Sequence, residues 1–208
     1  MINLAPLLEI SSRGHSHLCP RQILGVRMGL AGLAALGFMD PPAKKRLLVI
    51  SESDGCFVDG ISAPTRCSVG QRTLRVVDYG KIAAVFIDVQ TGYAVRFAPA
   101  LGVRERAYAY APGETRHYSA QMQAYQIMPD DELLSSQPVR LTTPIEIILS
   151  RRGVRVNCDV CGEEIINERE VQEDGQVLCL ACAGNAYYCP EPQELFLPDM
   201  FALAEHAI

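Results

Sequence analysis

The spacing of apolar residues predicts helices in the N-terminal part of the chain. Leucines at helical spacing indicate a short amphipathic helix over residues 3–12. Pro20 suits the first turn of a second helix, because its missing N–H costs nothing there, and it places Cys19 at or next to the N-cap. This second helix is expected to run to about Leu36, and its many Ala and Gly residues predict close packing against another element.

Short runs of β-branched and apolar residues follow, and they are typical of strands. Residues 46–51 are expected to form a buried strand, and residues 56–63 a short helix that Pro64 terminates. Turn signals separate the next runs, which predicts strands of an antiparallel sheet. These runs begin at Thr73, Ala83 and Tyr93.

The later part of the chain is interpreted as helix followed by extended chain. Residues 106–126 are expected to be largely helical despite a Pro-Gly break, and residues 139–148 to be an extended connection that Pro144 interrupts. Helices packed on an antiparallel sheet give an α+β fold. We therefore predict an α+β core domain over residues 1–150 and a smaller domain over residues 151–208.

Four cysteines in the smaller domain have the spacing of a structural zinc site. They form two Cys-x2-Cys pairs separated by 17 residues: Cys158 with Cys161, and Cys179 with Cys182. Two residues between paired cysteines let a tight turn aim both sulfurs at one ion, and Gly162 supports the first turn. Four ligands leave no open position on the metal, so the site is structural. A redox dithiol would explain one pair but not the matched second pair.

The segment between the two pairs is predicted to be a β-hairpin with its turn at residues 173–175. The second pair is expected to open a helix, as in treble-clef fingers. Such a segment has too small a core to fold without metal. Cys189 lies beyond the four ligands and is expected to be a bystander thiol.

Composition and charge narrow the classes of function. Of the 208 residues 49% are hydrophobic, which argues against a disordered chain, and the net charge of −5 gives no overall field that attracts nucleic acid. Arg151, Arg152 and Arg155 form a local basic run. Acidic residues follow at once, so a solvated strand end is the preferred interpretation.

The cellular compartment is also constrained by the sequence. The start of the chain lacks the basic region of a secretion signal, and the most apolar stretch, residues 26–39, is shorter than the roughly 20 residues of a membrane span. We expect a cytoplasmic protein that does not enter the membrane. Because the cytosol keeps thiols reduced, the eight cysteines are expected to serve metal binding or reactivity rather than disulfides.

A second group of chemically active residues lies directly before the second helix and comprises His15, His17 and Cys19. A thiolate at a helix N-terminus is stabilised by free N–H groups. These residue types suit a nucleophile with its base, or soft ligands of a transition metal. A structural role, in which the histidines cap backbone groups and Cys19 fills core volume, is the third interpretation. Further polar or soft side chains lie near the next helix: Cys56, Asp59 and Cys67.

These segments together resemble the FmdE family, which is named after a small component of formylmethanofuran dehydrogenase. The resemblance rests on HSHLCPR at residues 15–21, ESDGCFVDGI at 52–61, TRCSVGQRTLRVVDYGK at 65–81 and the terminal two-knuckle finger, in that order. The chain departs from the family pattern at Ser16 and Arg21, where glycine is usual. The resemblance implies an α+β core with a zinc-finger appendage and a homodimer. It also implies an accessory protein without the pterin-binding catalytic subunit of the molybdenum or tungsten enzyme.

Two hypotheses of function follow from these observations. In the first, the chain is a metal-binding accessory protein, in which the zinc finger organises a docking surface for a protein partner and the core holds a second metal or cofactor. The candidate core-site residues are His15, His17, Cys19, Cys56, Asp59 and Cys67. In the second, the chain is a thiol-dependent enzyme with Cys19 as nucleophile, His17 or His15 as base, and Asp59 orienting the base. Nucleic-acid binding through the finger is disfavoured, because the knuckle region is acidic.

Overall fold

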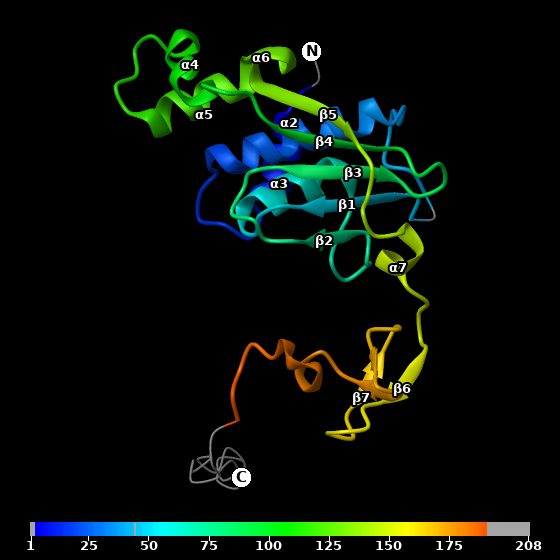
Figure 1. Cartoon of the computed structure of the whole chain (residues 1–208). Coiled ribbons are helices and arrows are strands. Elements are labelled where there is room, and N and C mark those ends of the chain that lie inside the picture. The colour runs from blue at the N-terminus through cyan, green and yellow to red at the C-terminus, as the bar shows by residue number, and fades with distance from the viewer. Residues whose placement is uncertain (1–2, 44, 191–208) are drawn as a thin grey trace, which may run out of the picture. The chain divides into compact units, whose positions relative to one another are not determined.

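The computed structural model describes residues 3–43 and 45–190. The chain divides into two compact units, Met1–Ile148 and Leu149–Ile208, and each is described by itself. Mixed helices and an antiparallel-rich sheet confirm the predicted α+β class (Figure 1). Whether the predicted domains, 1–150 and 151–208, fold independently of each other stays a prediction.

A five-stranded sheet forms the centre of the first unit, with the strand order β2-β1-β3-β4-β5. Its strands are β1 (Leu47–Ser51), β2 (Leu74–Val76), β3 (Ala84–Asp88), β4 (Ala94–Pro99) and β5 (Leu134–Val139). β1 pairs with β3, β3 with β4, and β4 with β5, all antiparallel. β2 instead pairs parallel to β1, with Val49 opposite Leu74.

The position of β2 differs from the sequence-based expectation of consecutive antiparallel strands. A helix connects β1 to β2, and a helical crossover returns the chain in the same direction as the first strand. The segment around Gly80 then carries the chain from the sheet edge past β1 to β3. This segment hydrogen-bonds to the end of β1, because Tyr79 N and Lys81 N both donate to Glu52 O, at 2.9 and 3.2 Å. It is therefore a crossing connection and not a hairpin turn.

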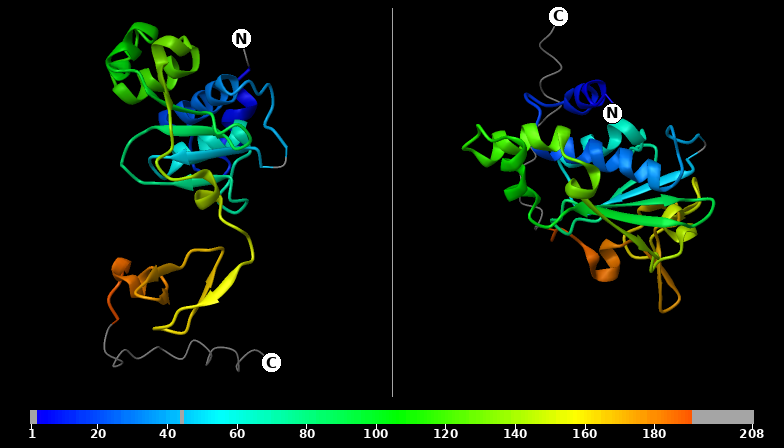
Figure 2. Two further views of the ribbon diagram at one scale, coloured as in Figure 1. Left: turned by 45° about the vertical axis from the view of Figure 1, so that its right-hand side comes forward. Right: turned by 90° about the horizontal axis from the view of Figure 1, so that it is seen from above.

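Helices of the first unit pack on one face of the sheet, as the right-hand view of Figure 2 shows. They are α1 (Ala5–Ser12), α2 (Pro20–Ala35), α3 (Cys56–Thr65), α4 (Val103–Tyr110), α5 (His117–Ile127), α6 (Asp130–Leu133) and α7 (Ile145–Leu149). The predicted N-cap at Cys19 and the predicted break between α4 and α5 are both confirmed. Among the described residues, no helix combines the length and apolarity needed to cross a bilayer.

Two local predictions were wrong. Pro64 does not terminate α3, which continues to Thr65: Arg66 N still donates to Ser62 O, and the left-handed φ of Arg66 ends the helix. Proline in the last turn leaves most of the helix hydrogen bonds in place. The segment after β5 is not extended throughout, because a short helix, α7, begins directly after Pro144. Proline is tolerated at such a helix start.

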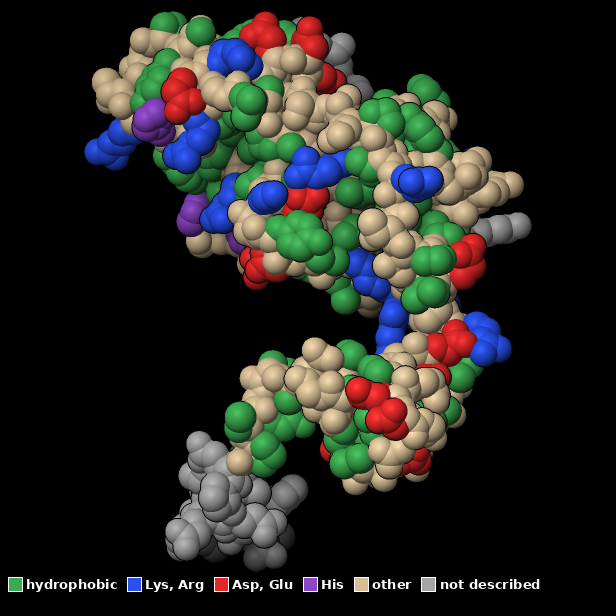
Figure 3. Space-filling model, in the orientation of Figure 1, with side chains coloured by type: hydrophobic (Ala, Val, Ile, Leu, Met, Phe, Trp, Pro, Cys, Tyr) green, Lys and Arg blue, Asp and Glu red, His purple; other side chains and the backbone are tan. Residues whose placement is uncertain are grey.

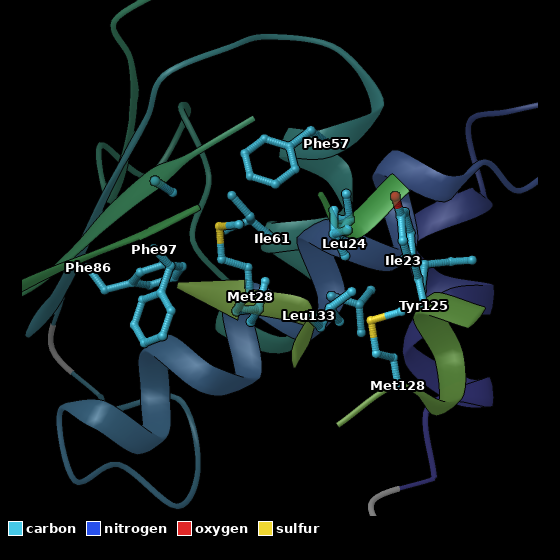
Figure 4. Close-up of a cluster of buried hydrophobic side chains, with 14 of the residues drawn as sticks. Ile23, Leu24, Met28, Phe57, Ile61, Phe86, Phe97, Tyr125, Met128 and Leu133 are labelled. Atoms are coloured by element: carbon cyan, nitrogen blue, oxygen red, sulfur yellow. The ribbon is translucent and has the colours of Figure 1, made fainter. Parts of the chain in front are cut away.

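The core of the first unit depends on a close crossing of α2 and α3. Gly25 on α2 faces Gly60 on α3, and a Cβ at Gly25 would lie 2.4 Å from the carbonyl oxygen of Phe57. The absence of both side chains lets the backbones touch, which confirms the close packing predicted from the glycine content of α2. Met28 and Ile61 extend this contact toward Phe86 of the sheet, and all three are fully buried (Figure 4).

The second unit is built from two hairpins and one helical turn. Its elements are β6 (Arg155–Asn157), β7 (Glu164–Ile166), β8 (Val171–Glu173), β9 (Gln176–Leu178) and η1 (Ala181–Asn185). The predicted turn is confirmed, with Asp174 and Gly175 at φ +48° and +78° between β8 and β9. The helix expected at the second cysteine pair is only a single turn, because Gly184 takes a left-handed φ of +83° and ends it.

Candidate metal centre and core site

The first cysteine knuckle lies between β6 and β7. Cys158 follows β6 directly, and the chain reverses so that Gly162 N donates to Cys158 O at 2.9 Å. Gly162 has φ +76°, a conformation that residues with a Cβ rarely adopt. Cys158 N then donates to Glu163 O at 3.0 Å, which closes the turn and directs both sulfurs to its inner side.

The second knuckle follows β9 and enters the helical turn η1. Ala183 N donates to Cys179 O at 2.9 Å, so Cys179 and Cys182 lie on the same side of one turn. Asp159 ties the two knuckles together: its amide donates to Val177 O at 2.8 Å, and its carboxylate accepts from Val177 N at 2.7 Å. These bonds place the first knuckle beside β9.

The four cysteine sulfurs converge on one point. The Sγ atoms of Cys158, Cys161, Cys179 and Cys182 all lie within 4.8 Å of one another. The distance between the Sγ atoms of Cys161 and Cys179 is 3.9 Å. In the described part of the chain, this is the one group of three or more His, Cys, Asp or Glu side chains close enough to hold a metal ion.

Electrostatics at this group favour a bound cation. Backbone amides of Cys161 and Cys179 lower the pKa of Cys158 to about 6, so this thiol ionises readily. Hydrogen bonding to Cys179 and burial raise the pKa of Cys182 to about 12. Four adjacent thiols therefore cannot all ionise alone, whereas a cation at their centre stabilises every thiolate.

The hydrophobic core of the second unit is very small. Its buried residues among those described are Cys158, Ile165 and Leu178. Such a core is too small to offset the conformational entropy of ordering the segment, so the thiols are the main available source of stability.

The basic run before the first knuckle is largely neutralised. Arg151 forms an ion pair with Glu168 at 2.5 Å, and Arg155 pairs with Glu164. Figure 3 shows acidic side chains on the visible face of the second unit. This arrangement leaves little uncompensated positive charge for a phosphate backbone.

In the first unit, two cysteines meet where α2 and α3 begin. Cys19 is the N-cap of α2, Cys56 is the first residue of α3, and their Sγ atoms are 2.9 Å apart. Cys19 is held in place because its amide donates to Gln22 Oε1 at 2.8 Å, while the buried Gln22 amide group donates to Ser11 O. Burial, with the hydrogen bond to Cys19, raises the pKa of Cys56 to about 11.

The two histidines do not bond to these thiols. His15 Nε2 lies 2.8 Å from Asp59 Oδ2, and both side chains are partly exposed. His17 Nδ1 instead bonds to the hydroxyl of Ser16 at 2.9 Å. The predicted pairing of Cys19 with a histidine is therefore not seen in the structure.

Cys67 lies away from the other candidate residues of the core site. It follows the C-terminal end of α3, and its buried thiol lies 3.8 Å from Leu47 O at the start of β1. Cys56 stands at the opposite end of both elements, since α3 begins after β1 ends. Burial raises the pKa of Cys67. The structure thus brings together two pairs, Cys19 with Cys56 and His15 with Asp59, and separates Cys67 from them.

Comparison with known proteins decides the family. A family model described as "FmdE, Molybdenum formylmethanofuran dehydrogenase operon" matches residues 14–135. The chain belongs to the FmdE family. The resemblance inferred from the sequence is confirmed, and the matched range includes every candidate residue of the core site.

The FmdE-family chain is also similar to a longer protein. It is 26% identical over 210 residues to an Archaeoglobus fulgidus protein named "Probable S-adenosyl-L-methionine-binding protein". That match covers 88% of this chain and 54% of the relative. The chain therefore spans about half the length of this curated relative.

A solved structure supports the fold. The crystal structure of a tungsten formylmethanofuran dehydrogenase FmdE-like protein from Syntrophus aciditrophicus aligns with a TM-score of 0.57 and 21% identity. The alignment covers 90% of this chain and 96% of that chain. At this identity the likeness shows the fold alone.

A cleft beside Cys19 was missed by the sequence analysis. Arg104 and Tyr118, which lie on α4 and α5, line it together with Cys19 and Arg21. Tyr118 reaches across to the N-terminal segment, where its hydroxyl donates to Leu18 O at 3.0 Å. Nothing local in the sequence marks these residues, because the contact joins positions about 100 residues apart and depends on the tertiary fold.

Proposed function

We propose that this chain is a zinc-bearing accessory protein of the FmdE family whose core binds a second soft metal ion. The convergence of the four finger sulfurs carries the proposal. Tetrahedral zinc with Zn–S bonds of about 2.3 Å requires sulfur atoms about 3.8 Å apart. The distance of 3.9 Å between Cys161 and Cys179 meets this requirement.

The finger zinc has a structural role in this proposal. Four thiolates fill the coordination sphere, so no position remains for water or substrate. The folded finger then serves as a docking surface for a protein partner, for example the large catalytic component of an enzyme. The Syntrophus aciditrophicus protein is named after a tungsten enzyme, which supports a partner of that class.

The second metal is proposed to bind at Cys19 and Cys56, with His15 and His17 as further candidate ligands. Two thiols 2.9 Å apart offer soft ligands that suit a transition metal. Asp59 holds the His15 ring through a hydrogen bond, as carboxylates commonly do for metal-binding histidines.

The alternative, a thiol-dependent enzyme, is less well supported. A nucleophilic cysteine needs a base within hydrogen-bond reach. Cys19 bonds to Cys56, whereas His17 bonds to Ser16 and His15 to Asp59. The arrangement of these donors favours metal binding over nucleophilic catalysis.

Metal content measured on the full chain, purified under reducing conditions, tests the proposal. We expect one zinc per chain that Cys161→Ser removes, and a second metal that Cys19→Ser or Cys56→Ser removes. Cys189→Ser is the matched control, because Cys189 is an exposed thiol outside both groups, and it should retain both metals. A single metal that survives Cys19→Ser would contradict the second site. Rapid alkylation of Cys19 near neutral pH would favour the enzyme.

The remaining features of the proposal follow the family resemblance and the sequence. We propose a homodimer in the cytoplasm, where thiols stay reduced. Light scattering on the purified chain, at a concentration above 10 µM by about tenfold or more, tests the dimer, since weak homodimers dissociate on dilution. A monomeric mass at such concentrations would contradict it.

A further inference from the structure

The cleft beside Cys19 has the size of a small-molecule site. Its volume is about 540 Å³, within the range of roughly 300–1,000 Å³ typical of ligand pockets. It lies at the N-terminal ends of α2 and α4, and α5 contributes Tyr118 and Tyr125 to its wall. All of its lining residues belong to the first unit.

Most of the wall is apolar. Leu24 and Val103 are buried, and Ala100 and Ile82 are half-buried beside them. The Tyr118 ring is fixed in position by its hydrogen bond to Leu18 O. An apolar surface of this kind gains free energy by excluding water, so an acyl chain or an aromatic ring suits it.

The charged residues of the cleft are mostly positive. Arg21 and Arg104 line it, and Glu105 is the one acidic lining residue. The structure as described gives the side chains of Arg21 and Arg104 no hydrogen bond and no ion pair. By contrast, Arg96 and Arg46 of the same unit each bind a carboxylate through two hydrogen bonds.

The two helix starts add to this positive potential. Arg21 follows the first residue of α2, and Arg104 follows the first residue of α4. The partial positive charge at a helix N-terminus attracts anions. Two such guanidinium groups at the mouth of an apolar cleft therefore complement a molecule with one apolar end and one anionic end.

We propose that this cleft binds an amphipathic carboxylate. Its apolar acyl or aryl body lies against Leu24, Ala100 and Val103, and its carboxylate pairs with Arg21 and Arg104. The site goes beyond the proposed metal-binding function and does not require a metal at Cys19.

Calorimetric titration of the full chain tests the proposal with three probes of one shape. These are 2-naphthoate, the neutral 2-naphthylmethanol and the cationic 2-naphthylmethylammonium. We expect 2-naphthoate to bind most tightly and 2-naphthylmethylammonium most weakly. Equal affinity for all three probes, or no binding of 2-naphthoate at millimolar concentration, would overturn the proposal.

Arginine variants test the carboxylate contact. Arg21→Gln and Arg104→Gln should each weaken 2-naphthoate binding by about tenfold, as the loss of a hydrogen bond to a charged group predicts, and leave 2-naphthylmethanol binding unchanged. Arg140→Gln is the matched control, because Arg140 is exposed in the same unit and does not line the cleft. Unchanged 2-naphthoate affinity in both variants would overturn the proposed contact.

A cleft-filling variant locates the probe. Ala100→Phe adds a ring to the wall, and it should abolish 2-naphthoate binding while circular dichroism shows an intact fold. Retained binding in a folded Ala100→Phe protein would overturn the proposal. A dimer that Ala100→Phe dissociates, as measured by light scattering, would also overturn it, because a second copy of the chain would then cover the cleft.

Metal content is measured on the same arginine variants. The proposed metal site predicts that both metals remain when 2-naphthoate binding is lost. Failure of the cleft proposal and failure of the metal proposal therefore give different results.

Discussion

The two units of this chain reach stability by different physical means. The first unit buries a sheet under crossing helices, and the side chains of Tyr125, Phe57 and Phe86 are almost completely removed from water. The second unit buries only Cys158, Ile165 and Leu178 among its described residues. The first therefore folds through hydrophobic burial and close packing, whereas the second needs the convergence of four thiols on a cation.

This difference teaches that similar local regularity can have unrelated causes. Both units contain hairpins and left-handed glycines, yet Gly60 removes a side chain so that two helices can touch, while Gly162 turns the backbone around a sulfur. Variants that affect one unit and spare the other separate the two causes.

The largest expected effect is the loss of one finger thiol. Cys158→Ser removes the most buried of the four ligands, so the site should no longer hold zinc tightly and the second unit should unfold at neutral pH. Limited proteolysis followed by mass spectrometry measures this change. Cleavage should concentrate in the segment 155–185, with the first unit intact. Protection equal to that of Cys189→Ser in this segment would contradict the account.

The next effect concerns the helix crossing of the first unit. Gly25→Ala places a methyl group 2.4 Å from Phe57 O, and overpacking of this kind costs about 3 kcal/mol of unfolding free energy. Chemical denaturation of the first unit should show this loss while zinc content stays the same. Gly113→Ala is the matched control, since a Cβ there meets open space. Equal stability of the two variants would show that the helices do not pack this closely.

A smaller effect is expected from the ion pair at the end of β3. The guanidinium of Arg46 donates two hydrogen bonds to Asp88 and holds the pKa of that carboxyl at about 2. Because the folded pKa lies below the unfolded value of about 3.9, the ionised carboxylate stabilises the fold above pH 4. This contribution is lost as the pH falls through 2. Allowing for solvent screening at the half-exposed Arg46, we expect about 1–2 kcal/mol.

Denaturation of Asp88→Asn at several pH values measures this contribution. The stability difference from the natural chain should be full at pH 6 and should shrink between about pH 4 and pH 2. Asp40→Asn, at an exposed aspartate, is the control and should show no such difference. A difference for Asp88→Asn that does not depend on pH would contradict the assigned pKa.

The smallest effect is expected at the surface of the second unit. Arg155 and Glu164 form an exposed ion pair, and such pairs contribute little to stability. Arg155→Gln should therefore leave the chelator concentration that strips the zinc unchanged, in contrast to Cys158→Ser. The same variant should not alter elution from heparin if the basic run is already neutralised. A large shift in either measurement would show that surface charge stabilises the finger or binds polyanions.

Local features of both units could be predicted from the sequence. Pro20 defines the start of α2, and Gly175 defines the hairpin turn, because each acts through its own backbone geometry. The spacing of Cys158 and Cys161 similarly fixes a knuckle within five residues, including Gly162. Signals of this kind depend little on the rest of the fold.

Features that depend on distant contacts could not be predicted. β2 joins β1 because α3 crosses over between them, which the apolar pattern of β2 does not reveal. Cys67 shares its residue type with Cys56 but lies at the other end of α3. Tyr118 lines the cleft through a contact with Leu18, and neither residue has a local signal for it.

The central claim is that metal, and not a hydrophobic core, holds the second unit folded. Hydrogen exchange of the full chain tests it most directly, measured before metal removal by a chelator, after removal, and after zinc is returned. The account predicts that amides of residues 155–185 lose protection in the stripped protein and regain it with zinc, while α2, α3 and the sheet keep theirs throughout. Unchanged protection of residues 155–185 in protein shown to be free of metal would contradict it.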